Sequence, residues 1–271
     1  MTRTVLITGC SSGIGLAAAD RFTAAGWNVI ATMRTPKGQS HGNRLVLPLD
    51  VTDSVAIDRA IAAGLARFGQ IDAVVNNAGY GQFGVFEAIP DAQIRAQFDV
   101  NLFGVMTMVR AILPHFRARR TGTIVNVSSG AGLFTLPLIS AYAASKFALE
   151  GFSEALAYEL GALGLAVKLV IPHGGVTETR FGERQAAEAP DGGLADYAPY
   201  VGRVTQAFAG MVAARSMGAA DVADVVFQAA TDGSDRLRYL VGDDARGFVR
   251  ARRELAEDDY VAFMRRQFPT A

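Results

Sequence analysis

The sequence contains little cysteine, histidine or lysine, and each scarcity excludes a class of protein. A single cysteine, Cys10, rules out an internal disulfide framework. The three histidines, His41, His115 and His173, lie far apart in the chain without metal-ligand spacing, so we expect no metal site. Only three of the 26 basic residues are lysines. A lysine at position 146 in so arginine-rich a chain hints that arginine does not serve there.

The chain also lacks a net charge and a long apolar run. Its 26 basic and 26 acidic residues balance, which gives no global attraction to nucleic acid or to an anionic membrane. No signal peptide precedes the apolar run at 4–8, and no apolar run reaches the length of a membrane span. We therefore expect a cytoplasmic protein that binds no nucleic acid and does not span a membrane.

Alternating strand and helix patterns predict the fold. Short apolar runs typical of strands occur at 5–8, 28–33, 45–49, 71–76, 123–128, 165–171 and 237–241. Helical spacing of apolar residues occurs at 13–25, 54–68, 90–116, 141–163, 220–231 and 245–268. Such alternation implies parallel pairing with right-handed crossovers. We therefore predict an α/β, doubly wound sheet with helices on both faces, in a single domain over residues 1–271.

Residues 173–218 break this alternation. The segment contains the turn-forming run Pro190-Asp191-Gly192-Gly193 and four aromatic residues, Phe181, Tyr197, Tyr200 and Phe208. It follows the sixth strand, at the carboxyl end of the sheet, where open α/β folds bind ligands. We interpret it as a substrate lid, with a solvent-facing insertion as the alternative.

A glycine-rich turn joins the first strand to the first helix. Glycines in such a turn permit tight bending and close approach of a pyrophosphate, and the helix N-terminus offers free N–H groups. We therefore predict a nucleotide site whose contacting residues are Gly9, Ser11, Ser12, Gly13, Ile14 and Gly15.

The end of the second strand indicates which nicotinamide cofactor is bound. An acidic residue there would hold a ribose 2′-hydroxyl, but the chain has Ala31-Thr32-Met33-Arg34-Thr35. Arg34, assisted by the Ser11 hydroxyl, is suited to pair with a 2′-phosphate. We predict NADP(H) in preference to NAD(H); the alternative is a solvated arginine at a strand end.

Tyr142 and Lys146 are four residues apart, so on a helix both project from one face. A lysine cation nearby favours the phenolate and would lower the pKa of the tyrosine. With Ser129 as a neutral hydrogen-bond donor, the pair forms a candidate proton-transfer device. The alternative is an ordinary helix surface.

Taken together, these motifs resemble the short-chain dehydrogenase/reductase family in its compact branch. The matching pieces are Thr8-Gly9-x3-Gly13-Ile14-Gly15, Asp50-Val51, Asn76-Asn77-Ala78-Gly79, Asn101, Ser129 and Tyr142-x3-Lys146, in family order and spacing. Within the family, residues 5–16 and 142–151 look like hydroxysteroid and retinol dehydrogenases. The resemblance implies a seven-stranded, mostly parallel Rossmann-type sheet and a homodimer or homotetramer.

The resemblance also assigns roles to individual residues. Asp50 would accept a hydrogen bond from the adenine amino group, with Val51 packed beside it. At the end of the fourth strand, the residues that would line the adenosine ribose and the approach to nicotinamide are Asn76, Ala78 and Gly79. Tyr142 and Lys146 would bind the nicotinamide ribose in addition to their catalytic roles, and Asn101 would hold a water that links Lys146 to solvent.

One loop departs from the family pattern. The family usually has Pro-Gly after the sixth strand, whereas this chain has Pro172-His173-Gly174-Gly175-Val176-Thr177. The departure leaves open whether Val176, Thr177 or Thr179 contacts the cofactor carboxamide. We interpret His173 as a packed loop residue.

The predicted function is an oxidoreductase that interconverts a carbonyl (ketone or aldehyde) and an alcohol by hydride transfer, with tyrosine acid/base catalysis. Apolar residues between Ser129 and Tyr142 suggest an apolar substrate; they are Leu133, Phe134, Leu136 and Leu138. The alternatives are a dehydratase or epimerase on the same scaffold, and a cofactor-binding sensor without turnover.

Overall fold

The computed structural model describes residues 2–173, 176, 194–214 and 217–269. Its centre is a seven-stranded sheet in the order β3-β2-β1-β4-β5-β6-β7, and each neighbouring pair is parallel. The strands are β1 (Thr4–Thr8), β2 (Asn28–Met33), β3 (Arg44–Pro48), β4 (Ala73–Asn76), β5 (Thr123–Val127), β6 (Ala166–Pro172) and β7 (Arg238–Val241). The predicted Rossmann-type α/β fold is confirmed.

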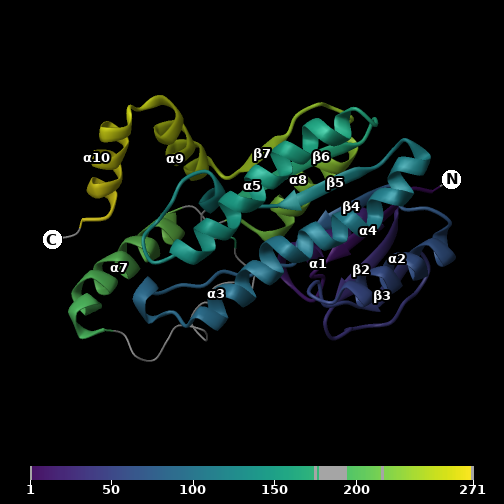
Figure 1. Cartoon of the computed structure of the whole chain (residues 1–271), viewed down its shortest axis with the longest axis horizontal. Helices are drawn as coiled ribbons and strands as arrows, with labels where there is room; N and C mark the ends of the chain where they lie inside the picture. The colour runs from purple at the N-terminus through teal and green to yellow at the C-terminus, as the bar shows by residue number, and fades with distance from the viewer. Residues whose placement is uncertain (1, 174–175, 177–193, 215–216, 270–271) are drawn as a thin grey trace.

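Helices cover both faces of the sheet because strand residues alternate in direction. Leu6, Ile30 and Val74 point to one face, under α2 (Ser54–Phe68), α4 (Gly104–Arg119) and α5 (Ser140–Gly161). Val5, Val29 and Val75 point to the other, under α1 (Gly13–Ala24) and α8 (Ala219–Thr231). Figure 1 shows α4 and α5 in front of the strands. The buried β-strands are therefore apolar on both sides, as a parallel sheet requires.

The layer formed by α1 and α8 contains the single tryptophan. Trp27 is 8% exposed and meets the ring of Phe22 edge-on at 5.1 Å and that of Phe227 at 6.3 Å. Arg21 on α1 lies over the Phe227 ring and pairs with Asp224 on α8. Aromatic packing and an exposed ion pair thus join these two helices.

Local signals explain where α2 begins and ends. The Asp53 carboxylate accepts hydrogen bonds from the backbone N–H groups of Val55 and Ala56 at 2.9 and 3.2 Å, so Asp53 is the N-cap of this helix. The helix ends at Gly69, whose φ of 80° is the left-handed conformation that glycine adopts readily.

The helix predicted at 90–116 has an irregular turn inside it. It consists of α3 (Asp91–Phe98), the π-helical turn η2 (Asp99–Phe103) and α4, and Asn101 lies in the π turn. By length and composition this combined helix, Asp91–Arg119, is apolar enough to cross a membrane. That is weak evidence for a span, because core helices of soluble proteins meet the same criterion. Its inner residues Leu102, Met108 and Ile112 pack in the core.

The C-terminal part differs from the prediction in two ways. The excursion after β6 contains the short helix η4 (Ala195–Tyr197) and a regular helix, α7 (Ala198–Ala214). The helix expected at 245–268 is instead two, α9 (Asp243–Glu254) and α10 (Glu257–Gln267), because Leu255 and Ala256 are extended. Two further short helices are η1 (Phe86–Ala88) and η3 (Gly130–Gly132).

A third apolar cluster joins these last helices to the loop before α5. Phe134 stacks on Phe248 of α9 at 5.0 Å, and Phe208 of α7 meets Phe268, just after α10, at 5.6 Å. Figure 1 shows α7, α9 and α10 at the end of the molecule opposite the N-terminus.

Candidate active site

The glycine-rich turn is shaped by three glycines that a larger residue would disrupt. Gly9 and Gly13 have φ of 77° and 58°, which glycine adopts at little cost. A Cβ on Gly15 would lie 2.4 Å from both the Asn77 side-chain nitrogen and the Gly9 carbonyl oxygen. The backbone is thus tightly folded at the start of α1, where helix geometry leaves the first N–H groups unpaired. Ser11, Ser12 and Ile14 lie partly exposed on the same turn.

Asn77 holds this turn in place. Its amide nitrogen donates to the carbonyl oxygens of Thr8 at 2.9 Å and Gly9 at 3.4 Å. In the opposite direction, the backbone N–H groups of Asn77 and Ala78 both donate to the Thr8 hydroxyl at 3.0 Å. The sequence motif Asn76-Asn77-Ala78-Gly79 includes Asn77, but no role was predicted for it. Its position directly after β4 was the feature that could have indicated a role at this edge of the sheet.

Asn76, which was predicted to line the cofactor, points elsewhere. Asn76 is 4% exposed, and its side-chain nitrogen donates to the side-chain oxygen Oδ1 of Asn126 at 2.8 Å, across the β4–β5 pair. Asn126 in turn donates to the Ser153 hydroxyl at 2.8 Å. The Asn76 side chain therefore makes a polar contact inside the fold, and the role of Asn76 toward the cofactor stays a prediction.

The residues predicted to surround the adenosine end lie beyond β2 and β3. Arg34 is exposed directly after β2, and its charge contributes to lowering the pKa of Asp50. The largest contribution to that lowering is a hydrogen bond from the Thr52 backbone N–H to the Asp50 carboxylate, at 3.0 Å. Val51 is buried against Gly104, where a Cβ would lie 2.9 Å from it.

Tyr142 and Lys146 lie side by side on α5, each 6% exposed. The Lys146 ammonium donates to the Val127 carbonyl at 3.0 Å and lies 5.9 Å from the centre of the Tyr142 ring. Ser129, which follows β5 and caps η3, forms a side-chain hydrogen bond with Tyr142. The structure therefore brings all three residues together at the carboxyl edge of the sheet.

The electrostatics of this pair differ from the sequence prediction. Burial raises the pKa of Tyr142 to about 12, and the Ser129 hydrogen bond opposes that rise. Burial lowers the pKa of Lys146 to about 8, against the opposing charge of Glu150. The predicted lowering of the tyrosine pKa by Lys146 is thus not seen. Removal from water disfavours the charged form of each group, and it is the largest contribution to both pKa shifts.

Asn101 and Gly79 complete the surroundings of Lys146. The Asn101 side chain is 1% exposed; it accepts from the Tyr80 N–H at 3.1 Å and donates to the Tyr80 carbonyl at 2.8 Å and the Ser145 hydroxyl at 3.1 Å. A Cβ on Gly79 would lie 3.1 Å from the Asn101 oxygen and 3.8 Å from the Lys146 ammonium. Glycine therefore leaves a small space that faces both groups.

A continuous path of short contacts links the turn to Lys146. A Cβ on Gly9 would lie 3.0 Å from Ala78, and the next residue, Gly79, faces Lys146 as described. The glycine-rich turn and the group of Ser129, Tyr142 and Lys146, here called the Tyr142 cluster, are therefore two ends of one candidate site. The residues present fit a dinucleotide cofactor, since its pyrophosphate needs a turn that approaches closely and free N–H groups.

The loop after β6 is described only in part. His173 is 8% exposed and packs edge-on against Phe134 at 4.8 Å and Phe248 at 5.8 Å, so it is a packed loop residue as predicted. Val176 pairs with Met217 in a parallel bridge. Thr177 and Thr179 lie outside the described residues.

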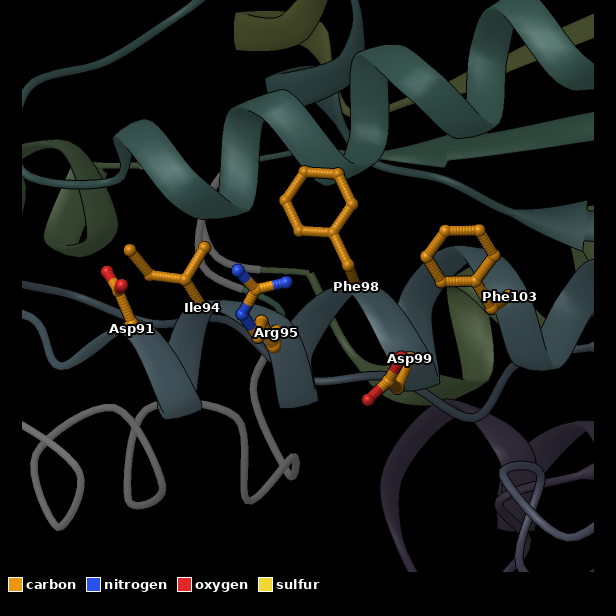
Figure 2. Close-up of a pocket in the computed structure, with 6 residues that line it drawn as sticks. All are labelled: Asp91, Ile94, Arg95, Phe98, Asp99 and Phe103. Carbon is orange, nitrogen blue, oxygen red and sulfur yellow. The ribbon is translucent and has the colours of Figure 1, made fainter.

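A pocket of about 440 Å³ lies on α3 and η2. Its lining residues are Asp91, Ile94, Arg95, Phe98, Asp99 and Phe103. Figure 2 shows Ile94, Phe98 and Phe103 projecting from the same side of the helix. None of these residues belongs to the Tyr142 cluster, so this pocket is separate from the candidate active site.

The model of the short chain dehydrogenase family matches residues 3–189, which include every element of the site described above. The chain belongs to the short-chain dehydrogenase family. It is therefore an oxidoreductase of a family that binds NAD or NADP and interconverts carbonyl and alcohol groups.

Curated relatives carry oxidoreductase names. An uncharacterized oxidoreductase of Schizosaccharomyces pombe is 34% identical over 87% of this chain and 99% of its own length. The 3-ketodihydrosphingosine reductase of Bacteroides thetaiotaomicron is 38% identical over 72% of this chain and 71% of its own. Retinol dehydrogenase 8 of Bos taurus is 41% identical over 65% of this chain and 60% of its own.

Solved short-chain dehydrogenases share the fold. The enzyme from Streptomyces avermitilis has a TM-score of 0.80 and 31% identity, covering 100% of this chain and 98% of that one. A metagenomic enzyme in complex with NADP has a TM-score of 0.67 and 28% identity, covering 88% and 96%. An enzyme from Burkholderia phymatum in complex with NAD, at 24% identity and a TM-score of 0.80, covers 93% of each chain and resembles this one in fold alone.

Proposed function

We propose that this short-chain dehydrogenase is an NADP(H)-dependent enzyme that interconverts a carbonyl and an alcohol on an apolar substrate, with Tyr142 as its acid and base. The observation that carries the proposal is the continuous site from the glycine-rich turn, through Ala78 and Gly79, to Lys146 and Tyr142. A nicotinamide cofactor, when bound there, would supply the hydride.

Tyr142 and Ser129 are placed to hold the oxygen of the substrate. Their hydroxyl groups already share a hydrogen bond, so both can donate to an oxygen on which negative charge develops. The raised pKa keeps Tyr142 protonated across neutral pH, which is the form that donates a proton in the reducing direction. The Lys146 cation, fixed on the Val127 carbonyl, would then stabilise the phenolate that remains.

Proton return is assigned to Lys146 and Asn101. The space that a Cβ on Gly79 would fill faces both the Asn101 oxygen and the Lys146 ammonium. A water there would have two polar partners and would link Lys146 to solvent.

The preference for NADP(H) is assigned to Arg34. Its guanidinium is exposed at the end of β2, and the partly exposed Ser11 hydroxyl lies on the glycine-rich turn. A bidentate pair with a 2′-phosphate is worth roughly 1.5–3 kcal/mol, or about 10- to 150-fold in affinity. An arginine makes no comparable pair with a ribose hydroxyl.

An apolar substrate is supported by the side chains around Tyr142. Tyr142 forms an apolar cluster with Ala131, Ile139 and Ala143, and Phe83 and Leu136 pack against this cluster. Phe83 also meets Phe208 of α7 at 5.8 Å, which makes α7 a wall of the same region. Phe134, which was predicted to contribute to an apolar substrate site, is only 1% exposed. It belongs to a different apolar cluster, with Phe248 of α9. Two relatives are named for retinol and for 3-ketodihydrosphingosine, both largely hydrocarbon compounds.

The test measures NADPH and NADH consumption with a panel of apolar ketones and aldehydes, for the wild type and for Tyr142→Phe. We expect consumption by the wild type with a lower KM for NADPH than for NADH. The phenylalanine variant should bind NADPH with nearly unchanged Kd and lose at least about 1,000-fold in kcat, since it has no proton to donate. Substantial turnover by that variant would exclude Tyr142 as the acid, and NADPH binding without consumption by the wild type would indicate a sensor.

A further inference from the structure

Glu150 is a buried carboxylate that the proposed mechanism does not use. It lies on α5 one helical turn beyond Lys146, so Tyr142, Lys146 and Glu150 follow one another at intervals of four residues along the helix. Its side chain is 5% exposed. Glutamate is rarely buried to this extent unless it is paired, so its partners indicate what it does.

Arg238 is the main partner of Glu150. The Arg238 Nε donates to the Glu150 carboxylate at 2.9 Å, and its Nη2 donates to Glu154, one turn further along α5, at 2.5 Å. Arg238 lies at the start of β7 and thus connects the edge of the sheet to α5. The two glutamates differ in two respects that matter here: Glu154 is 41% exposed, and it lies two helical turns from Lys146.

Glu150 also packs against the turn that carries Ser129. A Cβ on Gly132, at the end of η3, would lie 2.9 Å from Glu150 Cγ, 3.1 Å from the Ser128 hydroxyl and 3.0 Å from the Lys146 carbonyl oxygen. Ser128 stands between Val127, whose carbonyl holds the Lys146 ammonium, and Ser129. The carboxylate therefore adjoins the backbone that positions Lys146.

Few charged groups surround the Lys146 ammonium in the part of the chain that the structure describes. Tyr142 on α5 and Asn101 on η2 are neutral, and Val127 on β5 offers a carbonyl. Glu150 is the acidic group whose charge acts on Lys146, and it favours the ammonium form. Arg238, on β7, balances Glu150 from the far side.

We propose that Glu150 is a positioning residue that keeps Lys146 in its cationic form and holds the Val127–Ser129 turn against α5. The inference rests on the proposed function, in which Lys146 acts as a cation beside Tyr142. Loss of the carboxylate charge leaves the buried ammonium without an opposite charge, so Lys146 should lose its proton at lower pH.

The experiment measures kcat for carbonyl reduction by wild type and Glu150→Gln from about pH 6 to about pH 10, with saturating NADPH. Glutamine keeps the size of the side chain and an acceptor for Arg238 but carries no charge. We expect the alkaline limb of the profile to move to lower pH by about half a unit or more. At about pH 6, where Lys146 is protonated in both proteins, the two rates should agree within about twofold.

Glu154→Gln is the matched control, because it removes a carboxylate from the same arginine without neighbouring Lys146. Its profile should coincide with that of the wild type. Glu150→Asp, which keeps the charge, should restore most of the alkaline limb. An unshifted limb in Glu150→Gln, or a rate that falls equally at every pH, would overturn the inference, since a merely structural role affects all pH values alike.

Folding and the proposed function are checked separately. Thermal unfolding of each variant shows whether it folds. If Glu150→Gln does not fold, the same comparison is made between Arg238→Gln and the Glu150→Gln/Arg238→Gln double variant, in which the guanidinium of Arg238 is not left without its carboxylate. Absence of wild-type turnover would contradict the proposed function itself. Wild-type turnover with an unmoved limb in the variant contradicts only the role of Glu150.

Discussion

Lys146 occupies a position that costs the folded protein stability. Burial lowers the pKa of its ammonium from 10.5 to about 8. Between these pH values the unfolded chain binds more protons than the folded one, so stability rises with pH across this window. The destabilisation by the buried charge is complete below about pH 8 and absent above about pH 10.5. At pH 7 the penalty amounts to roughly 3 kcal/mol.

Replacing Lys146 by methionine should therefore stabilise the protein while it abolishes activity. The variant removes the buried charge but also the donor to the Val127 carbonyl, a loss of about 1 kcal/mol, which leaves a net gain of about 2 kcal/mol. Thermal unfolding at pH 7 should show a Tm higher by roughly 4–8 °C. The gain should shrink as the pH rises above about 8 and vanish near pH 10.5, because the wild-type lysine loses its penalty across this window.

Lys168→Met provides the contrast at a second buried lysine. Lys168 is 3% exposed and donates to the carbonyls of Ser234 and Arg236, where its charge also faces Asp232. Removing it leaves two carbonyls without their donor, so its Tm should fall. If Lys146→Met also lowered the Tm, this would contradict the proposal that the buried charge of Lys146 destabilises the folded protein.

At the scale of elements, the turn between β1 and α1 leaves no room for a side chain at position 15. We expect Gly15→Ala to cost about 1–3 kcal/mol, because its methyl group would lie 2.4 Å from the Gly9 carbonyl oxygen and force the turn open. The Kd for NADPH should rise by about tenfold or more, as the N–H groups lose their alignment. Calorimetric titration and thermal unfolding measure the two effects.

Gly151→Ala is the matched control, in an exposed position inside α5. A Cβ there meets nothing within 4 Å, so alanine should stabilise the helix by about 0.5–1 kcal/mol and leave the Kd unchanged. Equal effects of the two substitutions on NADPH binding would show that the close packing at Gly15 does not matter.

The elements were predictable from sequence because the hydrophobic period distinguishes strands from helices. The predicted strands and most helices are confirmed, and the glycine-rich turn lies between β1 and α1 as expected. The break between α9 and α10 was missed, although a basic last turn followed by the acidic first turn Glu257-Asp258-Asp259 was a usable signal.

The features of the site that the sequence did not reveal depend on tertiary contacts. The direction of the Asn76 side chain follows from its pairing with Asn126 on β5, fifty residues away. The π turn at Asn101 is set by hydrogen bonds to Tyr80 and Ser145. The raised pKa of Tyr142 reflects burial of its side chain in the apolar cluster with Ala131 and Ile139. Sequence spacing specifies none of these, whereas it does specify that Tyr142 and Lys146 share a helix face.

At the scale of the whole molecule, large apolar and aromatic side chains are exposed on η2 and α5. Phe103 is 53% exposed, Phe147 41% and Tyr158 74%. The pocket on α3 and η2 adds Ile94 and Phe98 to this surface (Figure 2). We propose that it forms the interface of a homodimer or homotetramer, since exposed apolar residues gathered on one face typically mark such contacts. We also propose that residues 1–271 form one domain.

Phe103→Glu should dissociate the assembly. A carboxylate at the centre of an apolar contact loses its hydration without gaining a partner, so light scattering should show a shift toward the monomer. Leu255→Glu, at a residue 41% exposed between α9 and α10, should leave the mass unchanged. A wild type that is monomeric at micromolar concentration would exclude the proposed interface.

The position of Trp27 determines what the intrinsic fluorescence of this protein reports. As the only tryptophan, it is packed with Phe22 and Phe227 in the layer of α1 and α8, on the face of the sheet opposite α4 and α5. Its emission therefore follows the unfolding of the layer that begins at the glycine-rich turn. Local opening of α7, α9 and α10 at the far end would leave the Trp27 emission unchanged, so this signal reports the layer of α1 and α8 and does not report those helices.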